Sequence, residues 1–487
     1  METFDVVIVG AGLSGIGAAW HLQNRTRNTT YAILEARDAI GGTWDLFRYP
    51  GIRSDSDMYT LGYRFKPWTE AKAIADGPSI LRYVTETAQE NGIDDHIRFR
   101  HKVVAAHWSS FDAAWTIEAE FDGQPRRFRC NYLSVCAGYY AYDAGYRPHW
   151  PGEERFAGQW VHPQHWPETL DYAGKRVVVI GSGATAMTIV PEMAKSAALV
   201  TMLQRSPTYV VSQPAEDALA RRMQAMLPSR LSYALTRWRK VLLQQFFYRM
   251  TRTRPARVKA KLLDMARAAI GDKYVAEHFT PAYNPWDQRL CLIPDNDLFD
   301  AITSGKASVV TDTIAHFERD GIRLASGELL EADIVVTATG LRLNAMGDIA
   351  LSVDGAPVDL GKALIYKGMM LGDVPNIAFT FGYTNASWTL KADLVSEYTC
   401  RVINHMRAQN TPIATPITSE DIEPEPFLDF SSGYVQRALD ILPKQGREAP
   451  WKLHQNYTRD LLTLRFGKVD DGTMVFSRPT TEAPIAA

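Results

Sequence analysis

The sequence predicts an α/β protein with two Rossmann-like dinucleotide-binding domains and an inserted helical subdomain. The first observation is an internal repeat: a β-branched run and a glycine turn occur at residues 5–15 and again at 176–186. The second is a stretch from 212 to 285, rich in Leu, Arg, Ala, Met and Gln, with apolar residues at helical spacing. Each glycine turn stands between a strand-like and a helix-like stretch, the context that makes such a motif specific.

The composition is that of an ordinary folded protein. The chain has 487 residues, 53 Lys and Arg against 55 Asp and Glu, and 46% hydrophobic residues, which excludes a disordered polymer. Its four cysteines form no C-x-x-C pair and no zinc-binding pattern with histidine, which favours a reducing compartment. The apolar stretches are too short and Gly-rich for a transmembrane helix, and the N-terminus lacks the pattern of a signal peptide, so we expect a cytoplasmic protein.

A second repeat suggests where each domain ends. Residues 133–138 and 334–340 both resemble buried strands that end in Ala or Gly, and alternating stretches with glycine turns at 122–123 and 326–327 precede them. We therefore expect the first domain to combine residues 1–145 with 341–487, which include the C-terminal segment. The second domain is expected to combine 146–211 with 286–340, and the helical insert to occupy 212–285.

The first glycine turn predicts a flavin site. Gly10, Gly12 and Gly15 follow a predicted strand at 6–9, so a pyrophosphate can rest on the N-terminus of the next helix. Glu35 ends the next predicted strand, 31–34, where its carboxylate can accept hydrogen bonds from ribose hydroxyls and would repel a 2′-phosphate. The site therefore suits FAD or NAD, and its N-terminal position favours FAD.

The second glycine turn predicts an NADP site. Gly181, Gly183 and Ala186 form the Ala-ending variant of the motif, and the next predicted strand, 199–203, leads into Gln204 and Arg205. The acid of the first unit is missing here, and a guanidinium is well suited to a phosphate group.

Two further stretches have unusual composition. Residues 41–55 mix Gly, Pro, aromatic and charged residues in a way that suits a loop over a flat cofactor, with Trp44 against a flavin ring and Asp55 beside it. Residues 156–167 contain His162 and His165, which could suggest a metal pair. No carboxylate or third ligand stands at suitable spacing, so we favour a structural linker and expect no metal.

These two stretches resemble the fingerprints of type I Baeyer–Villiger monooxygenases, and the similarity covers nearly the whole chain. The fixed positions that agree are Gly42, Trp44, Tyr49, Pro50, Gly51 and Asp55, and then Phe156, Gly158, His162, Trp166 and Pro167. Residues 49–60, 284–290 and 382–391 are most similar to the branch that contains the ethionamide-activating monooxygenase. The resemblance implies FAD contacts at Ser14, Thr43, Asp45, Leu46 and Val103, and NADPH contacts at Arg53, Ser54, Thr185 and Ser206.

The resemblance also implies a reaction. NADPH reduces FAD, O2 forms a C4a-peroxyflavin, and this species converts a ketone into an ester, with linear aliphatic or arylalkyl ketones as substrates and sulfide or thioamide S-oxygenation as a side activity. Arg289 occupies the family's active-site arginine position, and Asp55 would orient Arg289 and the nicotinamide. Two departures are visible: Gln288 replaces a lysine of many relatives, and Trp388 and Trp451 are only candidates for the C-terminal tryptophan of the cyclic-ketone enzymes.

The same residues allow other interpretations. A flavin monooxygenase restricted to N- or S-oxygenation shares most of these features, whereas a disulfide reductase would need a redox dithiol. Residues 221–261 contain twelve Lys and Arg and no Asp or Glu, and Trp238, Phe246, Phe247 and Tyr248 would suit an interfacial helix. We favour a solvated basic face over peripheral membrane contact there, and no nucleic-acid-binding motif accompanies the charge.

Overall fold

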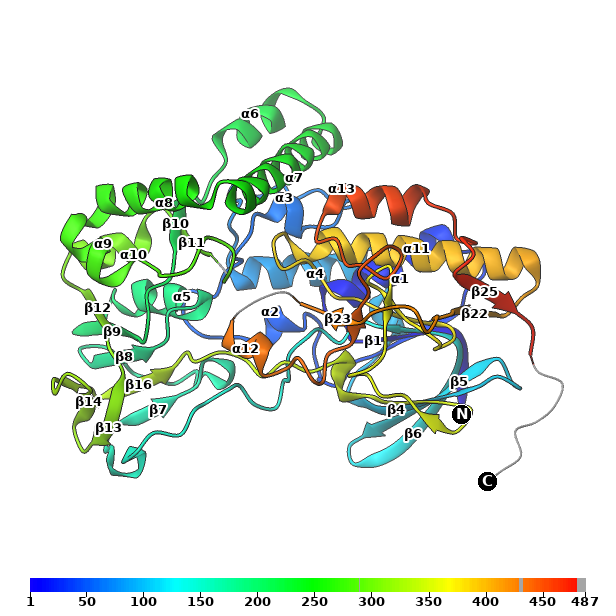
Figure 1. Ribbon diagram of the computed structural model, residues 1–487, viewed down its shortest axis with the longest axis horizontal. Coiled ribbons are helices and arrows are strands. Elements are labelled where there is room, and N and C mark those ends of the chain that lie inside the picture. Colours follow the sequence, from blue (N-terminus) through cyan, green and yellow to red (C-terminus); the bar gives the residue numbers. More distant parts are fainter. Residues whose placement is uncertain (289, 429–431, 480–487) are drawn as a thin grey trace.

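The computed structural model describes residues 1–288, 290–428 and 432–479, which form two α/β units with a helical insert beside them (Figure 1). The first unit contains a nine-stranded sheet in the order β18-β17-β4-β5-β6-β1-β2-β3, with β21 paired to β6. Its strands are β1 (Glu2–Val9), β2 (Tyr31–Leu34), β3 (Ile97–Arg98), β4 (His101–Ser109), β5 (Ala114–Phe121), β6 (Gln124–Val135), β17 (Ala350–Val353), β18 (Ala356–Pro357) and β21 (Ile377–Phe379). Segments far apart in the sequence therefore share one sheet.

The centre of this sheet is parallel and buried. β1 pairs in parallel with β2 and β6, and Val6–Val9 are buried, as expected of a strand with neighbours on both sides and helices over its faces. The predicted strand at 31–34 is confirmed as β2. The helices of this unit are α1 (Leu13–Arg25), α2 (Thr43–Leu46), α3 (Met58–Leu61), α4 (Gly77–Glu90) and α11 (Trp388–Gln409), of which α11 packs along α1.

The second unit has a five-stranded parallel sheet in the order β12-β9-β8-β16-β7. Its strands are β7 (Gln159–Val161), β8 (Arg176–Ile180), β9 (Leu199–Gln204), β12 (Ala307–Thr311) and β16 (Ile334–Thr337), with helices α5 (Ala184–Met193) and α10 (Asp297–Thr303). A small antiparallel sheet follows, with β13 (Ile314–Glu318), β14 (Gly321–Leu324) and β15 (Leu329–Glu331). The predicted turns at 122–123 and 326–327 are confirmed, because each joins two antiparallel strands.

The insert contains α6 (Ala218–Met226), α7 (Ser229–Thr253), α8 (Pro255–Ile270) and α9 (Asp272–His278). Its ends are joined by a parallel pair, β10 (Val210–Gln213) with β11 (Cys291–Pro294). Helical structure thus begins at 218, later than the 212 suggested by local composition. The sequence could not show this, because the pairing partner of Ser212 is Ile293, about eighty residues away.

The C-terminal segment packs back onto the first unit. It contains β19 (Ile365–Tyr366), β20 (Met370–Leu371), β22 (Ile413–Pro416), β23 (Glu425–Pro426), β24 (Lys444–Gln445), β25 (Met474–Ser477), α12 (Gly433–Gln436) and α13 (Tyr457–Asp460), which continues into a π-helical stretch, Leu461–Phe466. Asp460 is fixed by Lys391 of α11, at 2.8 Å, and by Tyr383, whose hydroxyl donates at 2.7 Å. Among the described residues, no helix combines the length and apolar character needed to cross a membrane.

Candidate functional site

Both glycine turns are as tight as the sequence predicts. A Cβ at Gly15 would lie 1.8 Å from the carbonyl oxygen of Gly10, so a side chain there would force the turn apart. In the second unit, Gly181 has a φ of +129°, and a Cβ there would lie 2.2 Å from the carbonyl oxygen of Ala338. The backbone therefore passes closely over the carboxyl end of each sheet at the point where a dinucleotide binds such folds.

The helices that follow these turns begin with free N–H groups. Within the described residues, α1 and α5 start at Gly12 and Gly183 with no side-chain cap and no acid in the first turn. The carboxylates of Asp57, Asp76 and Asp217 cap α3, α4 and α6, whereas α7 and α8 are also uncapped but follow other helices and not a strand and glycine turn. An uncapped N-terminus offers backbone donors and a positive dipole end to an anion. These two termini therefore fit the pyrophosphates of two dinucleotides.

Glu35 is fixed at the first turn. It is 5% exposed, and its two carboxylate oxygens accept hydrogen bonds from the backbone N–H of Ala11 at 2.7 Å and of Arg37 at 2.9 Å. Burial raises the pKa of this carboxyl, while the two N–H groups and the Arg37 charge oppose the shift. A carboxylate held in this position can accept hydrogen bonds from an adenosine ribose.

The second unit places a different residue at the corresponding point. Leu34 pairs with Val9 in the first sheet, and Leu203 pairs with Ile180 in the second, so Gln204 corresponds to Glu35. The amide of Gln204 is buried and donates to the carbonyl of His278 at 2.7 Å and to Thr311 Oγ1 at 2.9 Å. It faces into the core, and the exposed Arg205 is the next side chain along the chain.

One cavity of about 770 Å³ extends from the first glycine turn to the first residues of α5, and its volume is typical of cofactor-sized sites. Its lining includes twelve of the residues that the sequence suggested: Gly10, Gly12, Ser14, Glu35, Gly42, Thr43, Trp44, Arg53, Ser54, Asp55, Val103 and Thr185. Thr185 lies on α5, so the second unit opens onto the same space as the first.

Eight suggested residues are not part of this lining: Gly15, Asp45, Leu46, Gly181, Gly183, Ala186, Arg205 and Ser206. Asp45 is buried and forms ion pairs with Arg37 at 2.6 Å and Arg48 at 2.7 Å, so it holds the loop in place. Leu46 packs against the core, and Arg205 and Ser206 lie exposed after β9.

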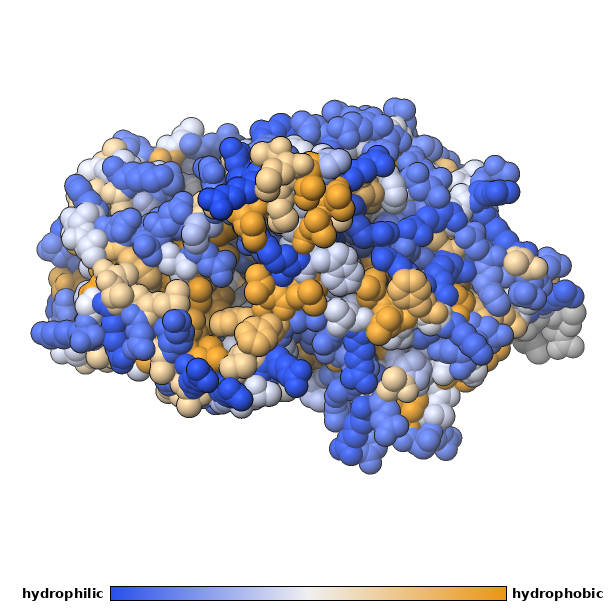
Figure 2. Space-filling view, turned by 90° about the horizontal axis from the view of Figure 1, so that it is seen from above, coloured by the Kyte–Doolittle hydropathy of each residue, from blue (hydrophilic) through white to orange (hydrophobic). Residues whose placement is uncertain are grey.

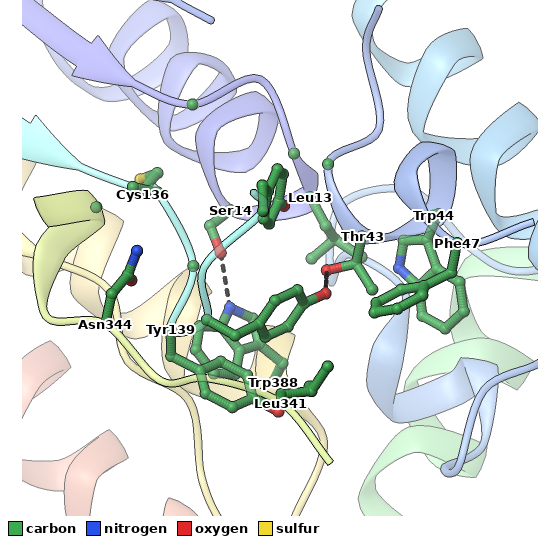
Figure 3. Close-up of a pocket in the computed structure, with 18 of the residues that line it drawn as sticks. Leu13, Ser14, Thr43, Trp44, Phe47, Cys136, Tyr139, Leu341, Asn344 and Trp388 are labelled. Atoms are coloured by element: carbon green, nitrogen blue, oxygen red, sulfur yellow. Dashed lines mark hydrogen bonds between the residues drawn. The ribbon is translucent and has the colours of Figure 1, made fainter. Parts of the chain in front are cut away.

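One wall of the cavity, beside Ser14, is largely apolar and aromatic (Figure 3). Trp388 donates from Nε1 to Ser14 Oγ at 2.7 Å and stacks on Tyr139, with ring centroids 5.1 Å apart. Leu341 and Asn344 approach from the connection after β16. Tyr139, Leu341 and Asn344 were missed by the sequence analysis; a signal was present, because they closely follow the Ala/Gly ends of the two repeated strands.

The charged residues of the 41–55 loop face the junction of the two units. Asp55 lines the cavity, and Arg53 forms an ion pair with Asp297, at the start of α10 in the second unit. Burial raises the pKa of Asp297, an effect that the charge of Arg53 opposes. Arg289, the suggested catalytic arginine, lies outside the described residues.

The cysteines of the described chain are buried and unbridged, which leaves no redox dithiol for a disulfide reductase. Cys136 lines the cavity, but burial raises the pKa of its thiol to about 11, so it stays protonated near neutral pH. His162 caps a short helical turn by accepting from the N–H of Gln164 at 3.2 Å, and His165 contacts the carbonyl of Asp143 at 3.0 Å. Within the described residues, no three His, Cys, Asp or Glu side chains cluster at metal-binding distance.

Two uncapped glycine-turn helices open toward a shared cavity, and this arrangement defines a flavoprotein oxidoreductase with a second, nicotinamide dinucleotide site. Comparison with known sequences agrees. Residues 73–344 match the flavin-binding monooxygenase-like family, and residues 8–70 match an NAD(P)-binding Rossmann-like domain. The chain is 55% identical to the FAD-containing monooxygenase EthA of Mycolicibacterium smegmatis, over 98% of both chains. It is 47% identical to the probable FAD-binding monooxygenase AlmA of Acinetobacter baylyi, over 98% of this chain and 96% of that protein.

Solved structures share the fold. An oxidised steroid monooxygenase bound to NADP has a TM-score of 0.78 at 21% identity, covering 98% of this chain and 100% of that one. Cyclohexanone monooxygenase from Rhodococcus sp. Phi1 bound to NADP+ has a TM-score of 0.76 at 18% identity, covering 98% and 99%. The chain therefore belongs to the FAD-containing monooxygenases with the Baeyer–Villiger monooxygenase fold, and its cofactors are FAD and NADP.

Proposed function

We propose that this monooxygenase converts linear aliphatic or arylalkyl ketones into esters. One atom of O2 enters the C–C bond beside the carbonyl, the other leaves as water, and NADPH with one proton supplies the two electrons and hydrogens that balance the reaction. The observation that supports this proposal is a cavity lined by residues of both dinucleotide units and by apolar and aromatic side chains.

The two units would hold the two cofactors in fixed places. The N-terminus of α1 and the carboxylate of Glu35 would bind the pyrophosphate and ribose of FAD, and the N-terminus of α5 with Arg205 would bind NADPH. Ser14, Thr43, Trp44 and Val103 line the cavity and would contact the flavin. Bound FAD, reduced by NADPH, supplies the activation of O2.

Arg289 is proposed to stabilise the reacting substrate, and Asp55 is proposed to orient Arg289. A ketone carbonyl gains negative charge on its oxygen when a nucleophile adds to it, and a positioned guanidinium stabilises that charge. Asp55 lines the cavity and would orient Arg289 and the nicotinamide by charge-assisted hydrogen bonds.

The aromatic wall of the cavity would select the substrate. Tyr139, Leu341 and Trp388 offer carbon surface to an alkyl or aryl chain, and Asn344 supplies a polar amide among them. The hydrogen bond from Trp388 to Ser14 fixes this wall to the start of α1, so the substrate would lie next to the proposed flavin contacts.

S-oxygenation of sulfides or thioamides is proposed as a side activity of the same site. Oxygen transfer to a sulfur lone pair creates no anionic carbonyl adduct, so it depends less on a guanidinium. The alternative function, an enzyme restricted to N- or S-oxygenation, predicts no ester at all.

The test is to compare Arg289→Ala with the parent enzyme on 2-dodecanone and on an alkyl aryl sulfide. We expect ester formation to fall by about a hundredfold or more, the loss typical when one preorganised charge-stabilising group is removed. Sulfoxide formation and anaerobic reduction of FAD by NADPH should fall much less. Equal losses on both substrates would contradict the role of Arg289, and a parent enzyme that makes sulfoxide but no ester would establish the alternative.

A further inference from the structure

The outer face of α7 carries an apolar stripe that is not covered by the rest of the protein. Leu231, Leu235, Trp238, Leu242 and Phe246 follow one another at spacings of three or four, and each is 41–64% exposed. These spacings place all five side chains on one side of the helix. The opposite side of α7 packs against the first unit, where Tyr233, Thr236 and Arg237 are buried.

Neighbouring elements extend the stripe. Leu219 and Met226 of α6 are 48% and 73% exposed, and Leu462 and Phe466, which follow α13, are 63% and 69% exposed. α13 lies beside α7, since the rings of Trp238 and Tyr457 are 5.9 Å apart and Thr458 bonds Gln245 at 3.3 Å. Figure 2 looks onto this face and shows orange areas separated and edged by blue. The apolar surface therefore spans three elements.

Ordinary solvation does not account for this face. The adjacent helix α8 presents Arg257, Lys261 and Asp264 to solvent, as a surface helix normally does. On α7 the stripe of outward positions from Leu231 to Phe246 consists of Leu, Trp and Phe, and exposed apolar side chains gathered on one face of a monomer mark an interaction site.

The surrounding charge points to the nature of the partner. The exposed Arg221, Arg222, Arg230, Arg249 and Arg254 lie on or beside α6 and α7, and residues 221–261 include no acid. A two-fold contact with a second copy would bring this same basic face against itself, which like charges oppose. An anionic partner is favoured by charge complementarity.

The structure also corrects the count of available charges. Arg237 is buried, Arg239 and Lys240 pair with Asp217, and Arg252 pairs with Asp287, so these four of the twelve basic residues are buried or ion-paired within the chain. Phe247 and Tyr248, which the sequence suggested for an interfacial helix, are half-buried. The exposed apolar surface consists instead of the leucines of α7 together with Leu462 and Phe466.

We propose that α6, α7 and the stretch after α13 form a docking surface for the headgroup region of an anionic lipid bilayer. α6 and α7 project beyond the two sheets as a ridge, so apolar side chains could enter the acyl boundary without a complementary groove (Figure 1). Basic residues around an apolar helix face are the combination that binds helices flat on anionic membranes.

The test uses the FAD-loaded enzyme and two kinds of vesicle, phosphatidylcholine alone and phosphatidylcholine mixed with phosphatidylglycerol. We expect co-sedimentation with the mixed vesicles only, weakened when the salt concentration is raised. Leu242→Ser with Phe246→Ser should weaken partition by about tenfold or more, since two exposed apolar side chains would no longer be buried. Arg222→Glu with Arg230→Glu should weaken it similarly.

The matched controls are Phe111→Ser, an exposed aromatic change outside this surface, and Lys306→Glu with Arg319→Glu, exposed charge changes in the second unit. They should leave vesicle binding unchanged. Absence of binding to the mixed vesicles, or equal loss in the control variants, would overturn the proposal. It would also be overturned if the Leu242 and Phe246 variant separated a dimer into monomers while the parent bound no vesicles. None of these outcomes depends on whether the substrate is a ketone or a sulfide.

Discussion

At the scale of single residues, the two dinucleotide sites differ at one corresponding position. Glu35 points its carboxylate to the first turn, whereas Gln204 turns its amide into the core and leaves the exposed Arg205 beside the second. The sequence predicted the change in charge. It could not show that Gln204 is engaged by His278, because that contact joins segments 74 residues apart.

Arg205→Ala should therefore weaken binding of NADPH but not of NADH, because only NADPH carries the 2′-phosphate. One hydrogen bond to a charged group contributes about 1.5–3 kcal/mol, which corresponds to a roughly ten- to hundredfold rise in KM for NADPH. Steady-state kinetics with both dinucleotides would measure this, with Arg319→Ala as the exposed-arginine control. An equal rise for NADH would contradict phosphate recognition.

His162 gives a residue-scale prediction about pH. Burial, with the nearby charges of His165 and Arg147, lowers its pKa to about 4, from an ordinary value near 6.5. Between these values the unfolded chain binds a proton that the folded chain does not, so this group makes stability fall as pH falls from 6.5 to 4.

His162→Asn keeps a helix-capping acceptor but cannot titrate. We expect its urea unfolding midpoint to decline less than that of the parent protein between pH 6.5 and 4, with little difference in slope above pH 7. Parallel declines across the acid range would show that His162 is not the group responsible.

At the scale of elements, a buried cation contributes to the attachment of α7 to the first unit. Arg237 is 5% exposed and donates to the carbonyls of Tyr59 at 2.8 Å and Gly62 at 2.7 Å, and it lies 3.5 Å from the Asp393 carboxylate. From the sequence it counts as one more residue of a basic stretch, because its partners are carbonyl groups and an acid of a distant helix.

Arg237→Met should destabilise the protein by about 3–5 kcal/mol, since it leaves a buried carboxylate and two carbonyl groups without this partner. Arg230→Met, an exposed change on the same helix, should stay within about 0.5 kcal/mol of the parent. Urea denaturation followed by circular dichroism would compare them, and equal midpoints for the two variants would refute a supporting role for Arg237.

The sequence predicted those helices, strands and turns that depend on residues close together in the chain. Strand β2, the hairpin turns at 122–123 and 326–327 and the helical character of the insert could be predicted, because apolar runs and turn glycines are local signals. The β10 and β11 pair and the joining of β17 and β21 to the first sheet could not, because these pairings connect residues that are far apart in the chain.

At the scale of the whole molecule, the two repeated units both contribute residues to one cavity. Twelve suggested residues meet there, including Thr185 from the second unit, and Arg53 and Asp297 pair across the junction. The aromatic wall of Tyr139 and Trp388 came together only through the fold, since 249 residues separate them in the sequence. This arrangement would bring a nicotinamide, a flavin and an apolar substrate into one space.

The most direct test of ketone oxygenation is to reduce the purified holoenzyme with NADPH without oxygen and then to admit isotopically labelled O2 together with 2-dodecanone. We expect NADPH to bleach the flavin, and one labelled oxygen to appear in an ester for each NADPH oxidised. Reoxidation that yields hydrogen peroxide and no ester would contradict ketone oxygenation as the function of the cavity.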